Sequence, residues 1–192
     1  MFLNIITPCV HIDNLKSISN SINIPRENYR WVVVFDLNEM PSDIPNNCEA
    51  YCYKNPNPII NSESRGDAQR NYGTELIHQG HVYYNDDDTT IHPELWDNIK
   101  DLDNDFISFD QNWNNGWFRL SGSEIGLNKT DTHNFITSRE LIGDTRWRLD
   151  IYESDGFFVE ECYRKSKSSI YIPKVLSVFN TLDKTRFIYQ KI

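Results

Sequence analysis

Apolar residues in the first half of the chain gather in short, nearly continuous runs. The runs cover residues 2–6, 29–35, 49–53 and 81–84. A continuous run, unlike an alternating one, is typical of a strand buried on both faces of a sheet. We therefore expect four strands, of which the first, second and fourth are buried. The first is ended by Thr7 and Pro8, the second by Asp36 and the fourth by an acidic turn at residues 86–88.

Two segments between these runs show the spacing of amphipathic helices. In residues 15–22, apolar side chains recur on one face before Pro25. Residues 66–79 carry apolar side chains at every fourth position, and Gly80 stands where a left-handed residue commonly ends a helix. We expect a helix over each segment.

The second half of the chain is less regular. We expect helices over residues 138–142 and 156–165 and late strands at 171–172 and 187–189. Trp113, Trp117 and Phe118 surround a segment rich in Gly and Asn, which favours a loop.

Strands and helices alternate through the first 90 residues. This order predicts an α/β fold in a single domain, with a mixed, mainly parallel central sheet flanked by helices. In open sheets of this kind, ligands bind at the carboxyl ends of the strands. Those ends are Thr7 and Pro8, Asp36 and residues 86–88, so we expect the functional site along that edge.

The charge of the chain is unevenly distributed. The net charge is −9, and residues 86–155 hold 16 acidic and 6 basic residues, so the whole excess lies there. A surplus of this sign disfavours nucleic acid and anionic membranes as partners and favours a cation. No apolar run is long enough for a membrane span and no export signal is evident, so we expect a soluble, cytoplasmic domain. Four irregularly spaced cysteines indicate reduced thiols.

Asp86, Asp87 and Asp88 follow the fourth predicted strand without a break. Neighbouring like charges repel by about 1 kcal/mol per pair even when exposed, so a bound cation would favour the arrangement. Carboxylates suit Mg²⁺ or Mn²⁺, which keep positions open for substrate phosphates. The alternative is that the three aspartates favourably precede a helix expected near residues 93–94.

Other metal and nucleotide patterns fail. Residues 101–105 carry three alternating aspartates, but Phe106 and Asn112 stand where a calcium loop needs Gly and Glu. His78 and His81 lack the Glu and the spacing of a zinc protease. The sequence contains neither a P-loop nor a G-x-G-x-x-G motif.

A longer pattern connects the helix, the fourth strand and the aspartates. Residues 65–73, 80–88 and 93–95 together resemble the signature of family-2 glycosyltransferases of the GT-A fold. In that family, a helix with an A-R-N-x-G pattern leads to a strand and a terminal aspartate cluster, the D-x-D motif. Residues 5–8 resemble the family's first strand and nucleotide loop, and residues 135–164 and 172–178 resemble its acceptor half.

The resemblance spans nearly the whole chain. It implies one glycosyltransferase domain over residues 1–192, with a nucleotide-binding half at 1–90 and an acceptor-binding half at 91–192. The sequence also resembles a small glycosyltransferase domain of large algal, chlorella-type viruses, where such domains build capsid glycans. On this basis the domain would act in the host cytoplasm and could be part of a longer multidomain protein.

The resemblance implies a metal-dependent, inverting enzyme. It would move a hexose or deoxyhexose, of glucose or rhamnose type, from a UDP-sugar to a hydroxyl of a glycan or glycoprotein. Asp88 would be the principal ligand of Mn²⁺ or Mg²⁺, with Asp86 on the metal or the ribose. The implied nucleotide-sugar contacts are Thr7, Pro8, Asp36, Arg65, Arg70, Asn71, Asp86, Asp87 and Trp117. For Arg70, an ordinary structural ion pair is an equal alternative.

An inverting transfer needs a base that takes the proton from the acceptor hydroxyl. The family's base is the Asp of an E-D pair just before the acceptor helix. Here Ser154 precedes Asp155, with Glu153 one residue earlier, so the pair is incomplete. Asp155 is the first choice, Asp144 and Asp150 are rivals, and a plain helix cap is the alternative for Asp155.

The aromatic segment and two rival functions complete the expectations. An aromatic face suits the C–H side of a pyranose, which makes Trp117 a candidate for stacking on a sugar; the alternative is that it covers the sheet. A carbohydrate-binding module with structural Ca²⁺ is one rival function. A sugar-nucleotidyltransferase is the other, although residues 7–11 lack its Gly-rich basic loop. The donor sugar, the acceptor and the oligomeric state stay open.

Overall fold

The computed structural model describes residues 1–54 and 66–182. Its strands are β1 (Leu3–Cys9), β2 (Tyr29–Phe35), β3 (Glu49–Cys52), β4 (His81–Tyr84), β5 (Phe106–Trp113), β6 (Phe118–Leu120), β7 (Phe135–Ser138) and β8 (Ser169–Phe179). Its α-helices are α1 (Leu15–Ser21), α2 (Asp67–Glu75), α3 (Leu95–Ile99), α4 (Arg139–Ile142) and α5 (Ser154–Lys165). In the described part of the chain, no helix has the length and apolar character needed to cross a membrane. The four cysteines are free thiols, as predicted.

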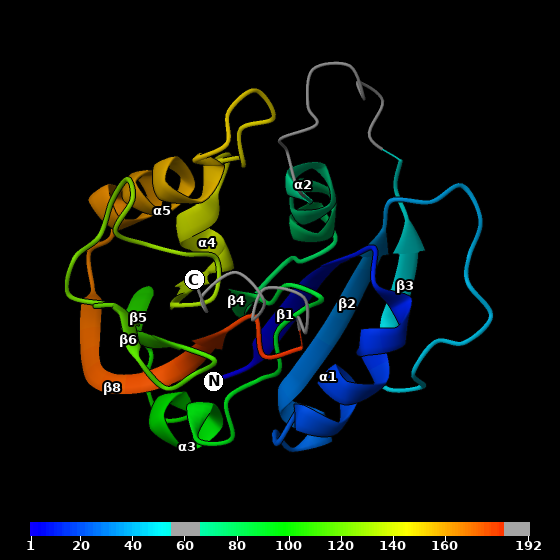
Figure 1. The fold of residues 1–192 in the computed structure, drawn as a ribbon. Coiled ribbons are helices and arrows are strands. Elements are labelled where there is room, and N and C mark those ends of the chain that lie inside the picture. The colour runs from blue at the N-terminus through cyan, green and yellow to red at the C-terminus, as the bar shows by residue number, and fades with distance from the viewer. Residues whose placement is uncertain (55–65, 183–192) are drawn as a thin grey trace, which may run out of the picture.

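All these strands join one sheet in the order β3-β2-β1-β4-β7-β5-β6, with β8 paired to β5 (Figure 1). The pairs β1–β2, β1–β4, β2–β3 and β5–β8 are parallel. The pairs β4–β7, β5–β6 and β5–β7 are antiparallel. The α/β fold with a mixed, partly parallel sheet that the sequence predicted is confirmed.

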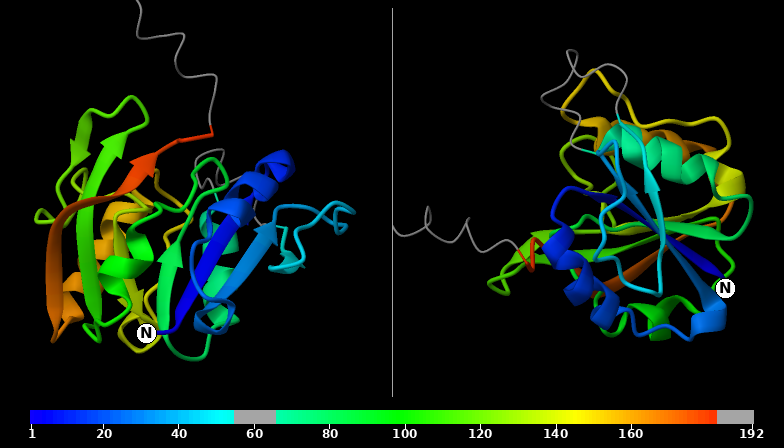
Figure 2. Two further views of the ribbon diagram at one scale, coloured as in Figure 1. Left: turned by 90° about the horizontal axis from the view of Figure 1, so that it is seen from below. Right: turned by 90° about the vertical axis from the view of Figure 1, so that its right-hand side faces the viewer.

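Helices cover both faces of the sheet. α1 and α3 lie on one face, and α2, α4 and α5 lie on the other (Figures 1 and 2). The core is accordingly in two parts, because alternate side chains of each central strand point to opposite faces. In β1, Leu3 and Ile5 pack toward α1 and α3, whereas Ile6 joins the cluster under α2, α4 and α5. The central strands are thus buried on both faces, which explains their continuous apolar runs.

The first strand is longer than we expected. Thr7 and Pro8 do not end β1, which pairs with β2 along its whole length through Cys9. Pro8 is tolerated because β4 leaves β1 at Ile6, whose carbonyl accepts a hydrogen bond from Asn85 N–H. Pro8, two residues further, faces the same side, where no strand is present to receive an N–H.

The second predicted helix is shorter than its pattern. α2 ends at Glu75. The N–H groups of Leu76 and Ile77 then donate hydrogen bonds to the carbonyls three residues earlier, and the chain turns at Gly80, which has a φ of +88°. A Cβ at Gly73 would lie 2.6 Å from the Ile6 side chain. Gly73 therefore allows α2 to lie close on β1 and brings its first turn to the carboxyl edge of the sheet.

The strands β5, β6 and β7 were missed by sequence reasoning. Trp113 and Phe118 lie on β5 and β6 rather than on a loop, and Trp117 lies between these two strands. The helices near residues 138 and 156 are confirmed as α4 and α5, and the strand at 171–172 is part of β8. The strand expected at 187–189 lies outside the described residues.

Candidate active site

The acidic turn after β4 lies against the end of β1. Asp87 is buried, and its Oδ2 accepts hydrogen bonds from Val10 N–H and His11 N–H, each at 2.6 Å. His11 Nδ1 lies 3.1 Å from the other oxygen. The Asp87 carboxylate therefore holds the segment that follows β1 in place, and its contact with a nucleotide stays a prediction.

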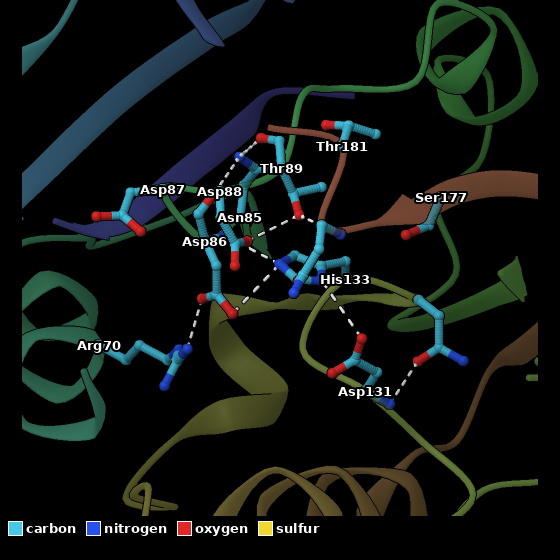
Figure 3. A network of polar contacts seen from close by, with 12 residues as sticks. Arg70, Asn85, Asp86, Asp87, Asp88, Thr89, Asp131, His133, Ser177 and Thr181 are labelled. Atoms are coloured by element: carbon cyan, nitrogen blue, oxygen red, sulfur yellow. Dashed lines mark hydrogen bonds and ion pairs between the residues drawn. The ribbon is translucent and has the colours of Figure 1, made fainter. Parts of the chain in front are cut away.

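Asp86 lies between two cationic side chains (Figure 3). Its Oδ1 is 2.5 Å from Arg70 Nη2, and its Oδ2 is 3.3 Å from His133 Nε2. Although burial disfavours the charged form, Arg70 and His133 hold the pKa of Asp86 well below its usual range. The carboxylate is thus ionised and oriented on both oxygens, while its side chain stays 26% exposed.

His133 is a buried residue that sequence reasoning missed. Its Nδ1 lies 3.4 Å from Asp131 Oδ2, on the side opposite to Asp86 (Figure 3). Burial opposes protonation, but the two flanking carboxylates raise the pKa of His133 to about 10. The protonated ring donates from Nε2 to the Asp86 carboxylate. The Asp86 amide nitrogen, 3.1 Å from Nε2, donates to it only when the ring is neutral.

Arg70 and Asn71 come from the first turns of α2. The Arg70 guanidinium pairs with Asp67 at 2.7 Å and with Asp86, and it lies over the Trp147 ring, 4.8 Å from its centroid. The structure therefore shows the ion-pair alternative for Arg70. Asn71 exchanges two hydrogen bonds of 2.8 Å with the backbone of Trp147. This contact joins α2 to the segment before α5, and nucleotide contacts of both residues stay predictions.

Asp88 is half-buried and adjoins the end of the described chain. Its Oδ1 accepts a hydrogen bond from the Thr89 hydroxyl at 3.0 Å, and its carbonyl accepts one from Leu182 N–H at 2.8 Å. The Thr90 N–H donates to the Thr181 hydroxyl at 2.7 Å. Burial raises the pKa of Asp88, and the neighbouring charge of Asp86 adds to this effect.

Asp155, the predicted base, is the second residue of α5. Its Oδ1 accepts a hydrogen bond from Gly156 N–H at 2.7 Å. Burial, assisted by the charge of Asp131, raises the pKa of Asp155 to about 6, and Arg70 acts in the opposite direction. The charges of Asp131 and Arg70, which belong to the group of ion pairs around Asp86, therefore also act on Asp155. The rival Asp144 is exposed, and the exposed Asp150 pairs with Arg148 at 3.0 Å.

The remaining predicted residues are spread along the carboxyl edge. Thr7 is buried in β1, and its hydroxyl accepts a hydrogen bond from Trp31 Nε1 at 3.0 Å. Pro8 packs against Gly66, where a Cβ would lie only 2.7 Å from the Pro8 ring. Asp36 is exposed after β2, and Trp117 is 73% exposed. Arg65 lies outside the described residues. All these site roles stay predictions.

The acidic turn fits a cation that is shared with a phosphate ligand. Among the described residues, no group of three or more His, Cys, Asp or Glu side chains could hold a metal ion by itself. Mg²⁺-type ions commonly use one or two carboxylates and complete their shell with phosphate and water. Asp88 and Asp86 provide such carboxylates. The repulsion that suggested a metal is partly relieved by Arg70 and His133, which the sequence argument did not foresee.

Comparison with known proteins identifies the fold. No protein-family model and no curated protein matches the chain. Residues 1–349 of S. aureus TarS superpose with a TM-score of 0.71 at 16% identity, over 93% of this chain and 60% of that one. The complex of the same fragment with UDP-GlcNAc gives 0.70 at 16%, over 93% and 58%. The mannosyltransferase PcManGT from Pyrobaculum calidifontis, in complex with GDP-Man and Mn²⁺, gives 0.67 at 12%, over 95% and 58%.

This likeness is one of fold. The sheet and its helices resemble the GT-A glycosyltransferase domains of these structures, and the chain spans about 60% of the length of the TarS fragment.

Proposed function

We propose that this chain is a glycosyltransferase that transfers a sugar from a nucleotide-sugar to an acceptor hydroxyl. The observation that carries the proposal is the ion pair between Asp86 of the acidic turn and Arg70 at the carboxyl edge of a GT-A-like sheet. Asp155 adds to it, because the charge of Arg70 acts on its carboxyl group. The ligands in the similar structures, UDP-GlcNAc and GDP-Man with Mn²⁺, support the nucleotide-sugar class.

The finer proposal follows the sequence resemblance. The donor is a UDP-sugar carrying a hexose or a deoxyhexose, the acceptor is a glycan or glycoprotein, and the transfer inverts the anomeric centre. The reaction takes place in the cytoplasm. A role in viral surface glycans stays an expectation from sequence, which the comparisons do not support.

Asp88, with Asp86 beside it, would hold Mn²⁺ or Mg²⁺. The bound cation would neutralise the charge that develops on the departing diphosphate. Arg70 and His133 keep Asp86 ionised and oriented, and Asp87 holds the segment after β1 in place. These side chains are ordered by contacts within the chain, so binding a donor requires little rearrangement of them.

Asp155 would accept the proton of the acceptor hydroxyl at a carboxylate oxygen. A base is most effective when its pKa lies close to the working pH. The raised pKa of Asp155, about 6, suits this role near neutrality, where the carboxylate is ionised yet basic enough to take a proton. Arg70, which pairs with Asp86 of the acidic turn, also acts on the charge of Asp155 at the start of α5.

Calorimetric titration of UDP with and without Mn²⁺ tests the proposal. The chain should bind UDP more tightly with Mn²⁺, and Asp88→Asn should abolish the metal-dependent part of the affinity. Asp101→Asn, which removes an exposed carboxylate near α3, is the matched control and should bind as the unmodified chain does. Absence of metal-dependent UDP binding in the unmodified chain would overturn the proposal and favour a carbohydrate-binding module.

Turnover separates the base from the binding residues. Asp155→Asn should leave UDP binding intact and remove sugar transfer. If this variant stayed active, the base role would pass to Asp144 or Asp150.

A further inference from the structure

The buried imidazole of His133 faces a carboxylate with each of its two nitrogens (Figure 3). We propose that His133, held by Asp131, is a positioning residue that fixes the Asp86 carboxylate in the orientation needed for the metal–nucleotide complex. The inference rests on the proposed function, because it assigns a task at the same acidic turn.

Strand register brings His133 to Asp86. β4 and β7 are antiparallel, with His81 opposite Ser138 and Val82 opposite Thr137. Continuing this register beyond the last ladder pair places Asp86 opposite His133. The two side chains therefore form a cross-strand pair just where the strands separate, at the carboxyl end of β4. A pair set by register has little freedom to shift along the strands.

Asp131 holds the imidazole at Nδ1, on the side opposite to Asp86. Asp131 Oδ2, which faces His133 Nδ1, also accepts hydrogen bonds from Gln111 Nε2 and Arg119 Nη1, both at 3.0 Å. The Arg119 guanidinium lies over the Phe179 ring, 3.9 Å from its centroid. Asp131 is thus anchored by β5, β6 and the end of β8. Because His133 itself is 1% exposed, the ring cannot swing away from Asp86 into solvent.

The contact with Asp86 exists in either form of the ring. A protonated Nε2 donates to Asp86 Oδ2, and an unprotonated Nε2 accepts from the Asp86 backbone N–H. With Arg70 on Oδ1, the plane of the carboxylate is set before a ligand arrives. A side chain oriented in advance loses less conformational freedom on binding, so the contact should increase metal-dependent affinity.

Two amide variants separate positioning from simple space filling. In His133→Gln, the amide nitrogen can take the place of Nε2 and keep the contact with Asp86. In His133→Asn, the amide nitrogen can take the place of Nδ1 and keep only the contact with Asp131. Both variants remove the ring, so a merely structural role predicts similar effects for the two. A positioning role predicts that Asn is much worse than Gln.

The measurement is UDP affinity with and without Mn²⁺, by calorimetry on the full chain. His133→Asn should weaken the Mn²⁺-dependent affinity about 10- to 100-fold, the usual cost of losing a partner that orients a metal ligand. His133→Gln should retain most of the affinity, and metal-free UDP binding should change little in either. Tyr83→Phe is the control, because it removes a hydroxyl that donates to the His133 carbonyl at 3.2 Å and leaves the ring contacts intact.

If His133→Asn does not fold, Asp131→Asn provides the second test. It keeps the imidazole but weakens its anchor, and it should also reduce the Mn²⁺-dependent affinity selectively. Equal losses in the Gln and Asn variants, or unchanged affinity in the folded Asn or Asp131 variant, would overturn the inference. In either case the unmodified chain would still bind UDP with Mn²⁺, which distinguishes this failure from failure of the proposed function.

Discussion

Asp155→Asn should make the protein more stable at neutral pH even as it removes transfer. Burial, with the charge of Asp131, raises the pKa of Asp155 from 3.8 to about 6. Between these values the folded state keeps a proton that the unfolded state has released, so the free energy of unfolding falls as the pH rises. The fall is about 1.4 kcal/mol per pH unit and about 3 kcal/mol in total at most. Asn is neutral at every pH and still accepts the Gly156 N–H, so the variant avoids this loss.

Urea-induced unfolding of the two proteins across the pH range measures the effect. The stability advantage of Asp155→Asn over the unmodified chain should grow by up to about 3 kcal/mol between about pH 4 and pH 7.5. Asp144→Asn, at an exposed carboxylate, is the control and should show no such growth. A difference between variant and unmodified chain that is the same at every pH would refute the reasoning, because the Asp155 carboxyl would then have an ordinary environment.

Three further predictions concern the same cluster. The rate of transfer should rise with pH and level off above about 6, as Asp155 becomes ionised; a rate that falls over this range would exclude it as the base. Arg70→Met should lower the free energy of unfolding in urea by about 3–5 kcal/mol, because it removes the buried cation that Asp67 and Asp86 share; a loss below about 1 kcal/mol would contradict this. Asn71→Ala should cost about 1–3 kcal/mol in the same assay, because it leaves the backbone groups of Trp147 unpaired.

The strands that were predicted well from the sequence are those in which burial produces a continuous apolar run. β2 and β4 have the predicted bounds, because they are apolar at nearly every position and end at polar residues. β5 was missed because its short start, with three apolar residues in four, lies between Asp105 and Asp110, which suggested an exposed acidic segment. In the structure, the Asp105 carboxylate accepts hydrogen bonds from the Lys167 and Ser168 N–H groups, which lead into β8. A polar residue at this position therefore helps to hold β8 beside β5.

The candidate-site residues that were predicted lie in segments of the sequence that are rich in acidic residues, and those that were missed do not stand out in the sequence. Asp86 and Asp155 follow from local patterns and the family resemblance. Asp131 and His133 lie in a polar stretch that reads as an ordinary loop, and one sequence does not show that such a stretch is buried. Conversely, the hydroxyl of Thr7 faces the core rather than the site, because β1 continues past the residue that was expected to end it.

The hydrogen bonds that join Thr181 to Thr90 and Leu182 to Asp88 bear on the order in which the protein folds. The bond between Thr90 N–H and the Thr181 hydroxyl spans 91 positions in the sequence. Contacts of such long range form only after a large loop has closed, at an entropic cost that local helices and hairpins do not incur. During synthesis, the acidic turn would therefore leave the ribosome long before the segment that fastens it. Strands β1 to β4 can form their parallel pairs early, but the acidic turn reaches its final shape only when the segment after β8 arrives.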